Sequence, residues 1–219
     1  MKYALIADIH ANLEAFEVVL EDAQKNNCTH YVCLGDVVGY NPNPCECMKI
    51  VRDMETPCIM GNHDEYCAGD IDLSGFNPHA SRAITWTRDQ LSDDERNWLQ
   101  RLKYLRMIAN FTIVHATLDA PKRWGYVMSK LDAAASFTYQ NTGVCFFGHT
   151  HVPLAFVRES NSVTGGKYDK LTVEKGKKYF INVGSVGQPR DGDPRAAYAI
   201  YDLEAGLPER LANRLALGK

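Results

Sequence analysis

The stretch Tyr-Ala-Leu-Ile-Ala-Asp-Ile-His at residues 3–10 places an Asp-x-His pair directly after a short apolar run. Its pattern predicts a buried strand over residues 3–7 that ends at Asp8. Residues 12–24 then show helical spacing behind an expected Asn N-cap, and residues 31–34 form a second apolar run. Because a strand, a helix and a strand follow one another, we expect a right-handed crossover and a largely parallel sheet.

Beyond this unit the alternation continues, and the pattern becomes richer in strands toward the C-terminus. Further helices are expected at 44–54, 80–91, 93–102 and 129–139, and further strands at 58–60, 111–114, 144–147, 153–158, 168–173, 179–183 and 197–202. We expect a loop at 161–166 and a solvated, Lys-rich hairpin at 167–178. The late strands indicate a second, more antiparallel sheet. We therefore expect one α/β domain over residues 1–219.

The composition is that of an ordinary globular protein. The chain has 219 residues, of which 45% are hydrophobic and 23% charged, with a net charge of −3. These values exclude disorder, collagen and coiled coil, and the lack of a basic excess argues against nucleic-acid binding. The seven cysteines are irregularly spaced and predict reduced thiols. Asp8 interrupts the first apolar run, and no run reaches the ~20 residues of a membrane span, so we expect a cytoplasmic protein without membrane contacts.

Five apolar runs end in residue types that bind metal ions. The segments are Asp8-Ile9-His10, Gly35-Asp36, Gly61-Asn62-His63-Asp64, Val114-His115 and Gly148-His149-Thr150-His151. In open α/β sheets, sites lie at the carboxyl ends of strands, so these segments would meet at one sheet edge. Taken singly, His115 fits a core residue, Asp36 a turn and Asn62 a cap. The five together, in order, indicate a site.

The residue types define the chemistry of this site. Carboxylate, imidazole and amide oxygen without thiolate suit divalent Mn, Fe, Zn, Co or Ni. Two such ions ~3.5–4 Å apart can clamp the attacking and leaving oxygens of an in-line phosphoryl displacement, with one carboxylate bridging them. In an extended Asp-x-His segment both side chains lie on one face and can reach one ion. A turn can aim His149 and His151 at different ions.

This set of motifs resembles that of the calcineurin-like metallophosphoesterase superfamily. The order is Asp-x-His, Gly-Asp-x-x-Gly, Gly-Asn-His-Asp, a single His and Gly-His-x-His, over residues 8–151. The loop at 182–196 is similar to that of small prokaryotic members known as phosphodiesterases or diadenosine-tetraphosphatase-like proteins. The resemblance implies a sandwich of two β-sheets flanked by helices, in four layers α/β/β/α.

The resemblance also implies a dinuclear centre of two divalent ions, Mn²⁺ foremost. The ligands would be Asp8, His10, Asp36 and His151 for the first ion, and Asp36, Asn62, His115 and His149 for the second. The nucleophile would be a bridging hydroxide, and His63 would stay unligated and protonate the leaving oxygen. The implied substrate is a small phosphodiester or a nucleotide-like phosphate ester.

The second motif departs from that of the protein phosphatases. It reads Gly-Asp-Val-Val-Gly-Tyr at 35–40 and lacks the acid or amide, and the Arg, that in those relatives orient the catalytic His and grip phosphate. Some other group must therefore orient His63, and Asp64 is expected to point elsewhere. Arg190 is the candidate phosphate anchor, because a guanidinium binds phosphate through two hydrogen bonds. An exposed loop arginine is an equal interpretation.

Other residues carry weaker signals. Asn62 and His79 are candidate substrate contacts, although His79 fits a cap or a surface position better. Trp124 or Tyr126 could stack a nucleobase. After Glu204 the chain lacks the strand and helix expected from relatives, which would leave a sheet edge open.

Three classes of function fit these observations. The complete ligand set with His63 favours a metal-dependent phosphodiesterase. A dinucleoside polyphosphate hydrolase, a phosphomonoesterase and a protein phosphatase are the enzyme alternatives. A metal-binding interaction scaffold is the non-enzyme alternative, although a scaffold has no need to keep every ligand. The expected partner is a small phosphate ester, and homo-oligomerisation stays open.

Overall fold

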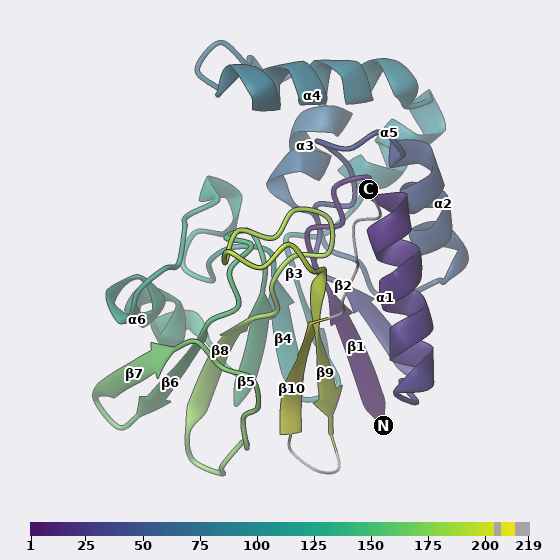
Figure 1. Cartoon of the computed structure of the whole chain (residues 1–219). Coiled ribbons are helices and arrows are strands. Elements are labelled where there is room, and N and C mark those ends of the chain that lie inside the picture. The colour runs from purple at the N-terminus through teal and green to yellow at the C-terminus, as the bar shows by residue number, and fades with distance from the viewer. Residues whose placement is uncertain (204–206, 213–219) are drawn as a thin grey trace.

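Two β-sheets lie at the centre of the molecule (Figure 1). The computed structural model describes residues 1–203 and, for the backbone, 207–212. The four-stranded sheet has the order β10-β9-β1-β2, formed by Leu207–Ala212, Ala197–Asp202, Lys2–Ile6 and His30–Cys33. The six-stranded sheet has the order β3-β4-β5-β8-β6-β7, formed by Leu105–Ile108, Phe111–Val114, Val144–Phe147, Lys178–Asn182, Ala155–Glu159 and Ser162–Gly166.

Strand direction follows the expectation in part. Strand β1 is parallel to β2, and β4, β5 and β8 are mutually parallel. The expected separate sheet of late strands is wrong, because β8, β6 and β7 extend the sheet of β4 and β5, whereas β9 pairs antiparallel with β1. The parallel strands therefore send their carboxyl ends toward the same side of the molecule, where the loops between strands and helices begin.

Helices α1 (Leu13–Lys25) and α2 (Pro44–Asp53) lie on the side of the four-stranded sheet, and α6 (Lys130–Tyr139) lies against the six-stranded sheet (Figure 1). Helices α3 (Asn62–Ala68), α4 (Pro78–Gln90) and α5 (Asp93–Gln100) pack on one another, and α3 and α4 lie beyond the ends of the strands (Figure 1). A 3-10 turn is formed by Pro121–Arg123. The expected caps form. The Asn12 side chain accepts from the Ala15 amide, and Ser92 with Glu95 makes a capping box at α5.

The side chains of β1 point alternately to the two faces of its sheet, and this alternation shows how the layers are built. Ala4 and Ile6 pack with α1 and α2, whereas Tyr3 and Leu5 face the second sheet and meet Phe111. Successive strand residues point to opposite faces, so one short strand contributes to two cores. A third cluster, which includes Phe137 and Phe180, joins α6 to the far face of the six-stranded sheet. The order of layers is α/β/β/α, which confirms the expected fold class.

Some local expectations were wrong. Residues 161–166 do not form a loop: Ser162–Gly166 is β7, which pairs with β6, and the β-branched Val163 and Thr164 suit a strand. Residues 168–173 form no regular strand. Two elements were not expected, namely β3 and the short helix α3 that begins directly at Asn62. Residues 58–60 make only isolated bridges, through Cys58 and Ile59.

The C-terminal expectation is also corrected. The chain does form a further strand, since β10 pairs antiparallel with β9 over its whole length and covers that sheet edge. Residues 204–206, where the strand and helix of relatives were expected to be lacking, lie outside the described residues. Pairing with β9 depends on backbone hydrogen bonds, and the mixed sequence of 207–212 carries little strand signal.

Candidate metal centre

The residues singled out from the five motifs meet at the carboxyl ends of the parallel strands. Asp8 and His10 follow β1, Asp36 follows β2, His115 follows β4, and His149 and His151 follow β5. Asn62 and His63 open α3. All of these side chains except Asn62 are buried, and Asn62 is half-buried. Five distant segments of the chain therefore contribute polar groups to one small volume.

Two overlapping groups of donor atoms can be distinguished here. Donor group 1 consists of Asp8, His10, Asp36 and His151, and donor group 2 of Asp36, His115 and His149. Within each group, one donor atom per residue lies within 4.8 Å of every other. Asp36 belongs to both groups, so its carboxylate is placed between them.

The hydrogen bonds of group 1 determine which imidazole nitrogen faces inward. His10 Nδ1 lies 3.2 Å from the Val38 carbonyl, and His151 Nδ1 lies 2.6 Å from the Gln188 carbonyl. A carbonyl only accepts, so both Nδ1 atoms carry the proton and both Nε2 atoms present lone pairs. These two Nε2 atoms lie 3.1 Å apart. Burial lowers the pKa of His10, which opposes a shared proton, so the pair fits a cation between the rings.

Group 2 follows the same rule with different partners. His115 Nδ1 donates to the Leu34 carbonyl at 2.7 Å, and its buried Nε2 has no hydrogen-bond partner within the described part of the chain. That Nε2 faces Asp36 Oδ2 at 3.3 Å. Burial opposes protonation of His115, yet Asp36 and Asp8 raise its pKa to about 10. The surroundings therefore favour positive charge at this point.

His149 uses the opposite tautomer. Its Nε2 donates to the Trp124 carbonyl at 2.8 Å, so its Nδ1 carries the lone pair. This Nδ1 lies 2.8 Å from the amide oxygen of Asn62, and two acceptors thus face one another. Metal-binding histidines characteristically donate their second nitrogen to a carbonyl or carboxylate. The donor sets of both groups therefore fit divalent cations held by oxygen and imidazole nitrogen.

The backbone at the site is strained. Asp8, His10, Asp36, His149 and His151 all have positive φ values, between 47° and 65°. A non-glycine residue in this region costs about 1–3 kcal/mol, and such strain clusters at functional sites. Surrounding contacts must hold each of these turns in place. The turn at His149 also requires a glycine before it, because a side chain there would collide with Asp8. A Cβ at Gly148 would lie 2.6 Å from Asp8 Oδ2.

Asp64 supports the turn that carries Asp36. Its carboxylate accepts from the backbone amides of Asp36, Val37 and Gly61 at 2.8–3.0 Å, and from that of Val38 at 3.3 Å. It points away from the donor groups, as the sequence led us to expect. Burial, helped by the charge of Asp36, raises the pKa of Asp64 to about 7, and the backbone donors oppose this rise. Asp64 thus positions a turn and does not orient His63.

His63 is held by packing. Its Nδ1 is buried and has no hydrogen-bond partner among residues 1–203. The ring lies 4.4 Å from the Tyr40 ring and 4.8 Å edge-on from His10. A Cβ at Gly39 would come within 2.5 Å of Nδ1, so only glycine leaves room for this ring. Tyr40 was missed in the sequence because nothing in the motif distinguishes it from an ordinary turn residue.

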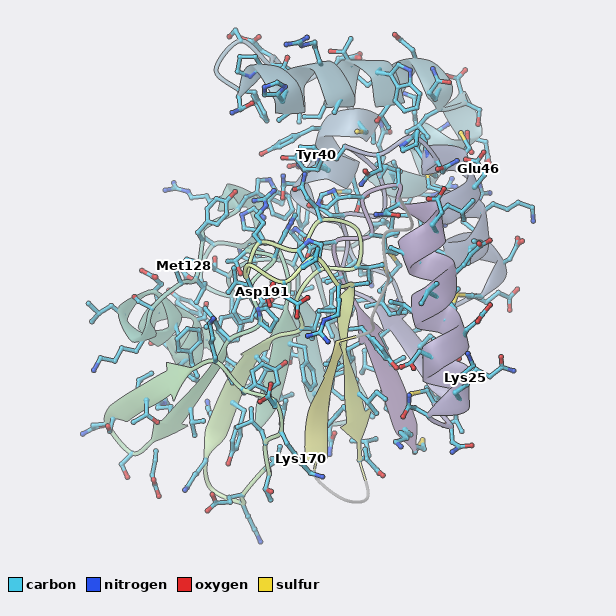
Figure 2. The ribbon with its side chains drawn as sticks, in the orientation of Figure 1. Lys25, Tyr40, Glu46, Met128, Lys170 and Asp191 are labelled. Carbon is cyan, nitrogen blue, oxygen red and sulfur yellow. The ribbon has the colours of Figure 1, made fainter. Side chains whose placement is uncertain are left out.

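Arg190 and His79 differ in their relation to the cluster. The Arg190 amide donates to the His151 carbonyl at 3.1 Å, and the exposed guanidinium lies beside Tyr40, whose phenol pKa it lowers against the larger effect of burial. In Figure 2, Tyr40 lies above the loop that carries Asp191. The exposed His79 lies in the first turn of α4, and its amide donates to the Asn77 side chain. No hydrogen bond or ring contact in the described chain joins the His79 side chain to the donor groups.

The contacts that support His149 were also missed in the sequence. The indole of Trp124 donates to Glu65 at 3.0 Å, and the Tyr104 hydroxyl donates to the other oxygen of the same carboxylate at 2.6 Å. Trp124 has a positive φ of 53°, which aims its carbonyl at His149. Glu65 follows the Gly-Asn-His-Asp motif directly, and that adjacency is the single sequence signal that could have identified it.

Comparisons with known proteins agree with this geometry. The model of the calcineurin-like phosphoesterase superfamily domain matches residues 1–206. An uncharacterized protein of Methanocaldococcus jannaschii, MJ0912, is 34% identical over 242 aligned residues, which cover 99% of this chain and 98% of that protein.

Among the described residues, every helix is too short or too polar to cross a membrane.

Solved structures show the same fold. A metallophosphoesterase from Sphaerobacter thermophilus superimposes with a TM-score of 0.84 and 37% identity, covering 98% of this chain and 88% of that one. A hypothetical protein from Pyrococcus horikoshii has a TM-score of 0.77 at 17% identity, covering 96% of this chain and 87% of that one. The second likeness concerns the fold alone.

Proposed function

The chain belongs to the calcineurin-like phosphoesterase superfamily, and from its buried Asp/His cluster we propose that it hydrolyses small phosphodiesters with two divalent metal ions. The observation that carries this proposal is the convergence of lone pairs. Unprotonated imidazole nitrogens of His10, His149 and His151 face two carboxylates in one buried volume. His115 Nε2 faces the same carboxylates, which favour positive charge at this point. Such an arrangement is repulsive unless cations occupy it.

We assign the two donor groups to two ions. Donor group 1 would hold one ion, and donor group 2, completed by the amide oxygen of Asn62, would hold the other. Asp36 would bridge them, since it is the residue common to both groups. Bound divalent ions would supply Lewis-acid polarisation of the phosphoryl oxygens and a water-derived nucleophile at neutral pH. Mn²⁺ suits the mixed nitrogen and oxygen set.

The remaining polar groups would act on the substrate itself. His63 lies against His10 but belongs to neither donor group, so its imidazole is free to protonate the leaving oxygen. The Arg190 guanidinium and the Tyr40 hydroxyl would bind the non-bridging phosphoryl oxygens. Tyr40 and Gly39 would hold the His63 ring in place, where protein phosphatases use an acid or amide.

The direct test is hydrolysis of bis-p-nitrophenyl phosphate by the full chain with added Mn²⁺. We expect turnover that chelation abolishes and Mn²⁺ restores. p-Nitrophenyl phosphate, assayed in parallel, distinguishes a diesterase from a monoesterase. A protein that turns over neither substrate with Mn²⁺, Ni²⁺, Co²⁺ or Fe²⁺ would contradict the proposal.

A further inference from the structure

One aromatic side chain is exposed directly beside the donor groups. The ring of Tyr126 lies 4.4 Å from the His149 ring, at an interplanar angle of 37°. The side chain is 58% exposed. Because His149 covers one face of the ring and more than half of the residue meets solvent, the other face is open to solvent beside donor group 2.

The fold itself makes little use of this ring. Tyr126 belongs to none of the three core clusters. Its hydroxyl makes no hydrogen bond with the described residues. By contrast, its neighbour Trp124 is tied to Glu65 through its indole nitrogen. An exposed aromatic ring without a structural partner, placed against a candidate metal ligand, is more readily explained by a ligand than by folding.

Two further tyrosines lie beside His63, on the same side of the donor groups. The Tyr40 ring lies 4.4 Å from the His63 ring, and the Tyr66 ring lies 6.4 Å from it. The backbone amide of His63 donates to the bridging carboxylate of Asp36, so both tyrosines lie near that carboxylate. Arg190 stands beside Tyr40. This side of the donor groups thus combines a cation and hydroxyl groups near Asp36 with an open aromatic face over His149.

We propose that Tyr126 is the stacking platform for a nucleobase, so that the substrate of this site is a nucleotide phosphodiester. The inference rests on the proposed phosphoesterase function. A phosphoryl group held at the donor groups and Arg190 would direct its nucleoside arm across His149 onto the open face of Tyr126. Every base has a π-face, so stacking favours nucleotides as a class over sugar phosphates and alkyl phosphates.

The test compares two ligands that differ by the base alone. Binding of AMP and of ribose 5-phosphate to the Mn²⁺-loaded protein is measured by isothermal titration calorimetry. We expect AMP to bind about 10- to 100-fold more tightly, as stacking on one aromatic ring allows. In Tyr126→Ala this preference should fall to about 2-fold or less, whereas Tyr126→Phe should retain it because the ring remains.

Tyr139→Ala is the matched control, because this tyrosine is 60% exposed and lies at the end of α6. It should keep the preference for AMP. Equal affinity for the two ligands in the wild type, binding of neither, or an undiminished AMP preference in Tyr126→Ala would overturn the platform. Circular dichroism verifies that each variant is folded.

The two proposals fail separately. If the protein hydrolyses bis-p-nitrophenyl phosphate but does not prefer AMP, the proposed function stands and the stacking role of Tyr126 is wrong. If it prefers AMP through Tyr126 but hydrolyses no diester, the stacking role stands and the proposed function is wrong.

Discussion

The two donor groups that share Asp36 are supported in different ways. In group 1 the imidazoles donate to the carbonyls of Val38 and Gln188, which lie in loops packed against the buried turn after β1. In group 2, His149 donates to Trp124, whose indole is in turn held by Glu65.

The two donor groups also differ in how far the residues at and beside them are exposed to solvent. The histidines of both groups are buried, but group 2 includes the half-buried Asn62, and the Tyr126 ring against His149 belongs to a residue that is 58% exposed. Group 1 is thus enclosed by the fold, and group 2 forms the side of the centre that opens to solvent. We infer that the geometry of group 1 is held by backbone carbonyls of packed loops. The geometry of group 2 depends in addition on a short series of side-chain contacts, which a substitution can remove.

The largest effect is expected from the residue that belongs to both groups. Asp36→Asn should remove both ions rather than one and lower kcat/KM by well over ~100-fold, the upper range for a residue that merely supports a ligand. Metal content by mass spectrometry and the diesterase assay measure the two effects. Loss of a single ion would contradict the bridging role.

His63 stands outside both groups, and its substitution should separate chemistry from metal binding. We expect His63→Ala to lower kcat about 10²- to 10⁴-fold, the contribution of a general acid. Both ions should remain bound, because His63 donates no atom to either group. If metal content falls together with the rate, His63 is a ligand and the assignment is wrong.

The support of group 2 can be removed without touching a ligand. Glu65→Ala deletes the acceptor of the Trp124 indole and of the Tyr104 hydroxyl. We expect one of the two ions to bind about 10- to 100-fold more weakly, while the other is unchanged. Metal titrations followed by calorimetry would resolve the two sites. Glu21→Ala on the exposed face of α1 is the matched control, and equal weakening of both sites would remove the distinction between the groups.

The smallest effect is expected away from both groups. Ser92 caps α5 through a capping box with Glu95. Ser92→Ala should lower the free energy of unfolding by about 1 kcal/mol, with metal content and kcat/KM unchanged. Urea denaturation with the diesterase assay checks this outcome. If metal binding also changed, the centre would respond to any loss of stability. The different effects expected for groups 1 and 2 could then not be assigned to their different supports.

Much of the site could be predicted because its signals are local. A strand end, a glycine and a polar residue are neighbours in the chain, as in Gly35-Asp36 and Gly148-His149, and parallel strands bring such ends together. Tyr40, Glu65 and Trp124 carried no such signal. Each acts through a contact with a residue that is distant in sequence or through a packed ring, and an exposed turn would use the same residue types.

The errors in the fold have a similar origin. Strand β10 could not be predicted from the mixed sequence of 207–212, because its hydrogen bonds come from β9. Helix α3 was missed because the metal motif occupies its first turn, so the residues that begin the helix were assigned to a strand end instead.

The sequence alone determined most of the strands and helices from β1 to β5 and the identity of the polar residues that follow the strands, because both depend on neighbours along the chain. The tertiary structure decided which nitrogen of each imidazole points inward. That choice depends on four carbonyls, from Leu34, Val38, Trp124 and Gln188, which folding brings from separate segments. A histidine next to a strand can face either way, and the carbonyl beyond it determines which lone pair faces the centre.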